Sequence, residues 1–308
     1  MSRRVVKVAL QAALSACVLA AVIVRVDARE VGALLARTAV WGLVAMVGLS
    51  VFDRWVMAVK WRILLRARGV DCRLGRVFRL YYVSSFVGSF LPFGVAGDIT
   101  RGAWMFRDGH QVREVASSIV VERVLGVASS ACLAAVCATL LQYRVGAEVR
   151  PLLLFAGALL GGVALFLAAS FLPALSAWVP GQRWAPVRGM VEFHASLAAY
   201  RRHGGALAAF FGLTLAEQLL PVAVHIVAAR ALGLAVPASV FVLTVPVAHM
   251  VARMPVSYNG IGVMEGVLAY TFVRMGLEPA EAVSIALVSE LVGMLSLVPA
   301  VFLLRPPR

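Results

Sequence analysis

Six long apolar runs dominate the pattern of hydrophobic and polar positions in this chain of 308 residues. Because a helix needs about 20 apolar residues to cross the hydrocarbon core of a bilayer, each run is long enough to be a transmembrane helix. The pattern therefore predicts an all-α polytopic membrane protein, with residues 1–308 forming a single membrane domain. The six predicted spans cover residues 8–26, 38–58, 115–142, 151–172, 205–232 and 280–304.

Two further apolar segments, residues 77–93 and 238–255, lead into breaks rich in proline and glycine. Lipid offers no hydrogen-bond partners to broken backbone, so such breaks survive in a membrane only where protein covers them or where they line a cavity. Matching breaks in the two halves of a chain indicate the binding site of a transporter. We therefore expect structural hinges at Pro92, Gly97, Pro255, Gly260 and Gly262.

The two halves of the chain also resemble each other beyond the breaks. Each break is followed by an apolar run with a glutamate and then a glycine, Glu122 with Gly126 and Glu290 with Gly293. We therefore predict two half-repeats, over about residues 38–142 and 205–304.

The basic residues suggest how the halves are oriented. If both broken segments are re-entrant hairpins, the positive-inside rule places both termini in the cytoplasm, and the hairpins enter from opposite sides as an inverted repeat. The alternative is eight full spans, in which each broken segment crosses the membrane once. In the hairpin arrangement most lysines and arginines lie on the cytoplasmic segments 1–7, 60–113, 173–204 and 305–308.

Composition limits the possible functions. The chain is 62% hydrophobic and only 14% charged, which leaves no polar stretch long enough for a soluble catalytic domain. Its net charge of +14 suits cytoplasmic loops that face anionic lipid, so we expect no nucleic-acid partner. The sequence contains no ATP-binding motif, and its four cysteines do not have the spacing of metal ligands. We therefore expect no enzymatic activity, cofactor or metal.

Charged residues inside the predicted spans are the first candidates for a functional site. Asp53-Arg54 and Glu122-Arg123 are adjacent opposite charges, and neighbouring residues of a helix do not face each other. We therefore expect each to pair with another helix, either as structural ion pairs or as part of a cavity for an anionic group. Glu217 and Glu290 are isolated acids, which could carry protons or neutralise those arginines.

The broken segments supply further candidates. Free backbone N–H groups at the start of a half-helix attract anions, although Asp98 could equally be an N-cap. Residues 60–79 alternate basic and apolar side chains, which is typical of an amphipathic segment in the cytoplasmic interface. There Lys60 and Arg62 would collect anionic lipid. The predicted cavity residues are Arg54, Asp98, Arg101, Glu122, Arg123, Asn259 and Glu265.

Several of these motifs together resemble the transmembrane domain of lysylphosphatidylglycerol synthases, a flippase-like membrane family. The resemblance spans about residues 50–300 and departs from the family pattern at Ala96, where glycine is frequent, and at Met264, where arginine is frequent. It rests on Lys60-Trp61-Arg62, Leu64-Leu65, Leu91-Pro92, Gly97-Asp98, Arg101, Glu122-Arg123, the segment from Pro255 to Gly262, and Glu265-Gly266.

The resemblance implies a bacterial inner-membrane protein that moves a lipid between leaflets. The lipid could be an anionic phospholipid, an aminoacyl-phospholipid, a polyprenyl phosphate or a hopanoid-type lipid. An alternative is an accessory subunit that anchors a separate lipid- or sugar-modifying enzyme and transports nothing. A third hypothesis, an intramembrane transferase, would need Asp98 or Glu265 as its acid or base.

Overall fold

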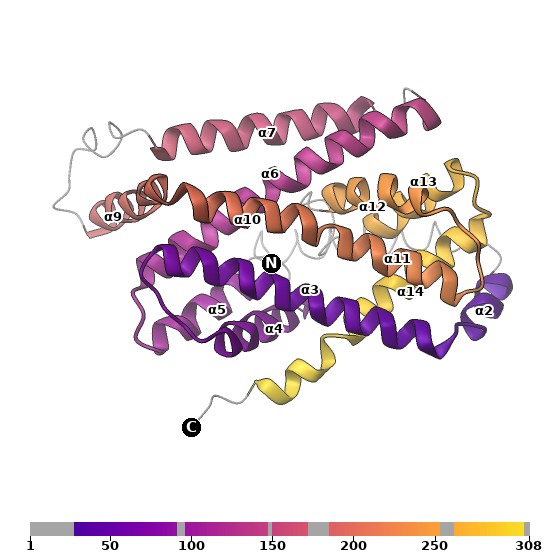
Figure 1. The fold of residues 1–308 in the computed structure, drawn as a ribbon, viewed down its shortest axis with the longest axis horizontal. Helices are drawn as coiled ribbons and strands as arrows, with labels where there is room; N and C mark the ends of the chain where they lie inside the picture. Colours follow the sequence, from indigo (N-terminus) through magenta and orange to yellow (C-terminus); the bar gives the residue numbers. More distant parts are fainter. Residues whose placement is uncertain (1–27, 91–95, 147–149, 172–184, 253–261, 305–308) are drawn as a thin grey trace, which may run out of the picture.

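The computed structural model describes residues 28–90, 96–146, 150–171, 185–252 and 262–304, and within these ranges it contains helices and no strand (Figure 1). The first half consists of α2 (Ala28–Ala36), α3 (Val40–Ala67), α4 (Leu74–Phe90), α5 (Ala96–Arg107), α6 (Val112–Val145) and α7 (Arg150–Phe171). The second half consists of α9 (Ala185–Ala199), the 3₁₀ segment η2 (Tyr200–His203), α10 (Gly204–Glu217), α11 (Leu219–Ala231), α12 (Ala238–Ala252), α13 (Val263–Arg274), α14 (Pro279–Leu295) and the 3₁₀ segment η3 (Val298–Leu303).

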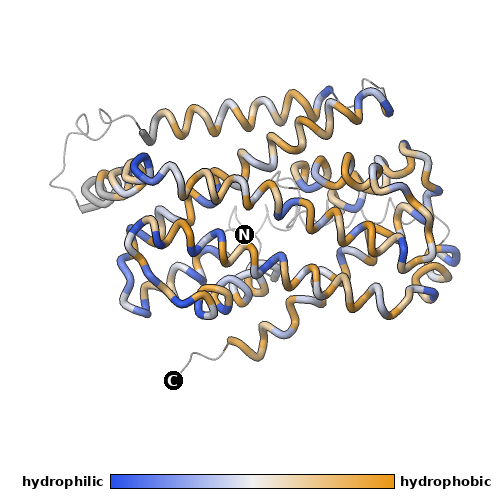
Figure 2. Tube along the Cα trace, viewed as in Figure 1, coloured by the Kyte–Doolittle hydropathy of each residue, from blue (hydrophilic) through white to orange (hydrophobic). Residues whose placement is uncertain are grey.

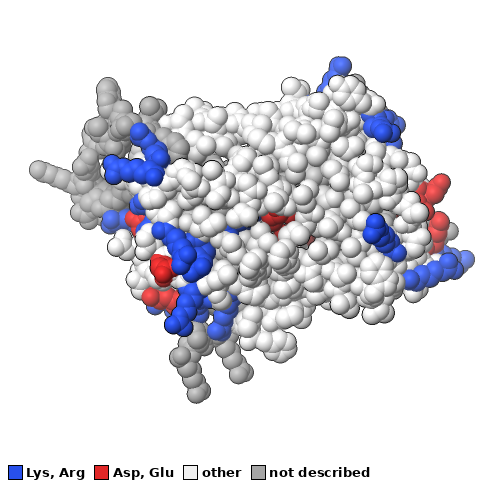
Figure 3. Space-filling view, in the orientation of Figure 1, with Lys and Arg blue, Asp and Glu red and all other residues white. Residues whose placement is uncertain are grey.

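Five helical stretches in the described residues are long and apolar enough to cross a membrane: Val40–Ala67, Val112–Val145, Arg150–Ala168, Phe193–Ala231 and Pro279–Leu303. Apolar residues run along the length of the long helices (Figure 2). On the face shown, charged residues gather at the two ends of the long axis, and the broad band between them is white except for a small acidic patch near its centre (Figure 3). This arrangement confirms the all-α polytopic membrane fold. The predicted first span, residues 8–26, lies outside the described residues.

The prediction that residues 60–79 form an amphipathic segment in the membrane interface is wrong. Residues 60–67 continue α3, and residues 74–79 begin α4. Trp61 and Leu65 are fully buried in a cluster with residues of α4 and α5, so the apolar face of the segment packs on protein. A hydrogen bond stabilises the turn between the helices, since Arg62 Nε donates to the carbonyl of Cys72 over 2.7 Å.

The predicted span 205–232 is interrupted. It forms α10 and α11, which meet at Gln218. Pro221 lies in the first turn of α11 and has no backbone N–H, so it cannot bond the carbonyl of Glu217 four residues earlier. The proline therefore gives this span a break of its own, which we had not predicted.

Two helical hairpins flank the centre of the bundle. α4 packs on α5 and α12 packs on α13, and the pairs lie toward opposite ends of the long axis (Figure 1). α4 and α12 each end where the described residues stop, at Phe90 and Ala252. The choice between re-entrant hairpins and full spans, and the inverted repeat, therefore stay predictions.

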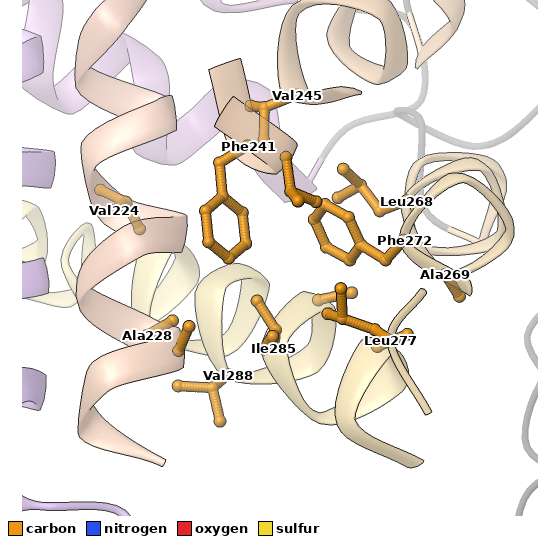
Figure 4. Close-up of a cluster of buried hydrophobic side chains, with 14 of the residues drawn as sticks. Val224, Ala228, Phe241, Val245, Leu268, Ala269, Phe272, Leu277, Ile285 and Val288 are labelled. Carbon is orange, nitrogen blue, oxygen red and sulfur yellow. The ribbon is translucent and has the colours of Figure 1, made fainter. Parts of the chain in front are cut away.

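The largest apolar core joins α11, α12, α13 and α14 with Met46 of α3. Phe241 and Phe272 meet edge to face at its centre, with ring centroids 5.4 Å apart (Figure 4). Val224 and Ile285 surround the two rings. This packing holds the second hairpin against α11 and α14.

The first hairpin depends on one close backbone approach. A methyl group at Gly97 in α5 would lie 2.5 Å from the carbonyl oxygen of Ser84 in α4. At Gly102, farther along the same helix, the nearest atom would be Cδ1 of Ile119 at 3.5 Å, an ordinary contact. Gly97 therefore lies at the close contact between the two helices, whereas Gly102 does not.

We expect Gly97→Ala to lower the free energy of unfolding by about 1–3 kcal/mol, because the methyl group overpacks the hairpin. Gly102→Ala serves as the matched control and should leave stability unchanged or raise it slightly, because alanine favours a helix. Thermal unfolding in one detergent would compare them. Equal stability of the two variants would contradict this account of the hairpin.

Candidate functional site

A polar cavity of about 420 Å³ lies in the interior of the bundle. It is bounded by α3, α4, α5, α6, α11, α12, α13 and α14, so both hairpins contribute to its wall. The polar residues that line it are Ser50, Asp53, Arg54, Tyr81, Ser84, Ser85, Ser89, Asp98, Arg101, Arg123, His225, His249, Ser289, Glu290 and Ser296.

Arg101 is the centre of the most extensive charged network at the cavity. The residue is 2% exposed. Its Nη2 lies 2.7 Å from Oδ1 of Asp98, one turn earlier in α5, and its Nη1 lies 2.7 Å from Oε2 of Glu122 in α6. A buried guanidinium between two carboxylates is neutralised without water, and it joins the first hairpin to α6.

Aromatic side chains complete the surroundings of Arg101. The guanidinium lies over the rings of Trp61 and Tyr81, 4.6 and 4.7 Å from their centroids. Tyr81 Oη donates to Oε1 of Glu122 over 2.8 Å, and Trp61 Nε1 donates to Oγ of Ser118 over 3.0 Å. Four helices thus hold Arg101 in one orientation, with cation–π contacts added to its ion pairs.

Arg123 belongs to the same network but has a different exposure. Its Nε donates to Oδ2 of Asp98 over 2.7 Å, so Asp98 bridges two arginines. The side chain of Arg123 is 52% exposed and lines the cavity, whereas Arg101 is enclosed. As we expected, both Glu122 and Arg123 pair with a neighbouring helix.

A second charged group lies along α3. Contrary to our expectation, Arg54 contacts its sequence neighbour, since its Nη2 lies 3.4 Å from Oδ2 of Asp53. The long arginine side chain folds back along its own helix, where Nη1 also lies 3.2 Å from Sδ of Met57. Both charged residues line the cavity.

The positions of Lys60 and Arg62 do not fit the prediction that these residues collect anionic lipid. Lys60 is 3% exposed, its Nζ donates to Oε2 of Glu217 over 2.8 Å, and the ammonium lies near the ring of Phe210. Glu217 therefore neutralises a lysine rather than an arginine. Arg62 lies outside the cavity lining and bonds the turn between α3 and α4.

The second break is only partly described. Pro92, Pro255, Asn259 and Gly260 lie outside the described residues. Gly262 precedes α13 with φ of 84°, a conformation that favours glycine, and its N–H donates to Oε2 of Glu265 over 2.7 Å. Glu265 thus caps α13 and does not line the cavity.

Glu290 and Gly97 are the other predicted residues that line the cavity. His225 and His249 line it as well, although neither was among the predicted site residues. Trp61 and Tyr81, which hold Arg101, were not predicted as site residues. The one sequence signal was Trp61 among the basic positions of residues 60–79, which we had assigned to the interface, and it did not extend to Tyr81.

The family model for the lysylphosphatidylglycerol synthase TM region matches residues 8–300 of this chain. The chain belongs to this family. The match covers almost the whole sequence, including both hairpins and every helix that lines the cavity. A comparison with curated proteins found no match. Family membership and the five candidate spans together indicate a multi-pass membrane protein.

The two cavity arginines should differ in their effect on stability. We expect Arg101→Gln to lower the free energy of unfolding by about 3–5 kcal/mol, because it leaves the buried Glu122 without its counter-charge and leaves Asp98 with Arg123 alone. Arg123→Gln should cost less than about 1 kcal/mol, since that side chain is half exposed. Thermal unfolding in one detergent would test the contrast, which a similar loss in both variants would contradict.

Proposed function

We propose that this chain carries the polar headgroup of a lipid between the leaflets of a bacterial inner membrane while the acyl chains stay in the bilayer. The observation that carries the proposal is the polar cavity inside an apolar bundle, with the half-exposed Arg123 on its wall. The basic ends of α3, α4 and α6 then face the cytoplasm, in keeping with the positive-inside rule.

The energetic barrier to lipid flipping is the removal of water from the headgroup. A cavity with fixed charges and hydroxyl groups replaces part of that water without any covalent step. Nε2 of His225 and Oγ of Ser289 are buried at this cavity and have no hydrogen-bond partner among the described residues. Such atoms are expected to bind a ligand or ordered water, which supports an occupied cavity.

The chemistry of the cavity favours a lipid that carries phosphate. Guanidinium groups bind phosphate oxygens through paired, charge-assisted hydrogen bonds, and Arg54 and Arg123 both line the cavity. Anionic phospholipids, aminoacyl-phospholipids and polyprenyl phosphates meet this requirement. A hopanoid-type lipid without phosphate does not use these side chains, and it is the weaker candidate.

We expect Arg123→Gln to slow lipid movement in proteoliposomes by about tenfold or more, because a hydrogen bond to a charged group contributes about 1.5–3 kcal/mol. The measurement is the loss of leaflet asymmetry of labelled phosphatidylglycerol, aminoacyl-phosphatidylglycerol and polyprenyl phosphate. Arg230→Gln, an exposed arginine at the end of α11, is the matched control and should keep the wild-type rate.

The same assay separates transport from an accessory role. A wild-type protein that is folded and inserted but accelerates none of the lipids would favour an accessory subunit that anchors a separate lipid- or sugar-modifying enzyme. Equal acceleration by wild type and Arg123→Gln would show lipid movement that does not use this cavity, and would overturn the proposed path.

A further inference from the structure

Asp53 presents an unsatisfied oxygen to the cavity. The residue is 7% exposed, and its Oδ1 is buried with no hydrogen-bond partner among the described residues. Its other oxygen, Oδ2, lies 3.4 Å from Nη2 of Arg54. A buried carboxylate oxygen without a donor is costly, so the group needs a proton, a ligand or another donor.

A second carboxyl group stands beside it. The carboxyl group of Glu217, the last residue of α10, lies within reach of the carboxyl group of Asp53 in α3. Ionised carboxylates are acceptors only, so two of them form a hydrogen bond only when one carries a proton. Lys60 already donates to Oε2 of Glu217, which leaves Asp53 as the group that lacks a donor.

The pair lies where two helices of the bundle meet. Glu217 lies at the break between α10 and α11, and Pro221 and His225 beyond the break line the same cavity as Asp53. The charged and titratable groups that face the pair or share its cavity are Arg54 and Lys60 of α3, Tyr81 of α4, Asp98 and Arg101 of α5, Arg123 of α6, His225 of α11, His249 of α12 and Glu290 of α14.

We infer that Asp53 and Glu217 share one proton and form a proton-binding site that is linked to anion binding at Arg54. With the proton bound, Asp53 no longer neutralises Arg54, whose guanidinium is then available to a phosphate in the cavity. When the proton leaves, the Asp53 carboxylate competes with the phosphate for the same guanidinium. Proton and anionic headgroup therefore strengthen each other's binding by thermodynamic linkage.

The inference of a shared proton depends only on the contacts of Asp53 and Glu217. The coupling of that proton to a headgroup also rests on the proposed function. A direct test of the proton is infrared spectroscopy of the protein in bilayers during a pH titration. Wild type should show the carbonyl stretch of a protonated carboxyl group at neutral pH, which shifts in deuterated water and disappears at alkaline pH. Asp53→Asn should remove this band.

Asp71→Asn is the matched control, since it makes the same chemical change in the turn between α3 and α4. The hydrogen bond from Arg66 Nε holds the pKa of this 74% exposed carboxyl below its usual range, so Asp71 is ionised at neutral pH and its loss should leave the band unchanged. A wild-type protein without the band would overturn the shared proton, even if Asp53→Asn does not fold. So would a band that survives in folded Asp53→Asn.

The coupling has its own measurement. Binding of dihexanoyl-phosphatidylglycerol, followed by calorimetry in buffers of different ionisation enthalpy, counts the protons taken up. Wild type should take up as much as one proton per lipid at mildly alkaline pH, and Asp53→Asn should bind with no uptake. Wild-type binding without proton uptake would overturn the coupling, while the absence of lipid binding would count against the proposed function and leave the infrared result to decide the proton site.

Discussion

The neutralisation of Arg101 by Asp98 and Glu122 is the interaction on which the arrangement of the first half depends. A guanidinium that is almost completely buried in a membrane protein is tolerated only when its charge is matched and its donors are used. Here the match needs α5 and α6 together, and the rings that cover the cation come from α3 and α4. One ion therefore fixes the relative positions of four helices.

That fixed arrangement explains how a polar cavity persists in an apolar bundle. Asp98 is already oriented by Arg101, so it presents its second oxygen to Arg123 and directs that arginine along the cavity wall. The second half contributes a different kind of wall. Its apolar core around Phe241 and Phe272 supports α11, α12 and α14, which bring two histidines and Glu290 to the cavity. Ion pairs position the helices of the first half around the cavity, and apolar packing positions those of the second half.

The sequence was sufficient to predict the helical membrane fold, the five long spans within the described residues and the family, because hydrophobic length and local motifs are properties of the chain itself. It also placed Asp98, Arg101, Glu122 and Arg123 among the candidate cavity residues. It could not show that Lys60 turns inward, because a basic residue beside a tryptophan has the same local pattern in an interface and in a buried ion pair. The partner that decides between them, Glu217, is 157 residues away in the chain.

Other failures have a similar origin. The break at the start of α11 was hidden within a continuous apolar run, although Pro221 was visible in it. The role of Glu265 as a helix cap depends on a backbone turn at Gly262, which composition does not distinguish from a ligand site. The aromatic rings that contact Arg101 come from other helices, so the spacing of residues in the sequence does not predict these contacts.

The contact between Gly97 and the backbone of Ser84 has a consequence for how this molecule can move. At this contact the two backbones meet with no side chain between them, so no change of rotamer there can let α4 slide along α5. We therefore expect α4 and α5 to move as one unit when the cavity changes shape.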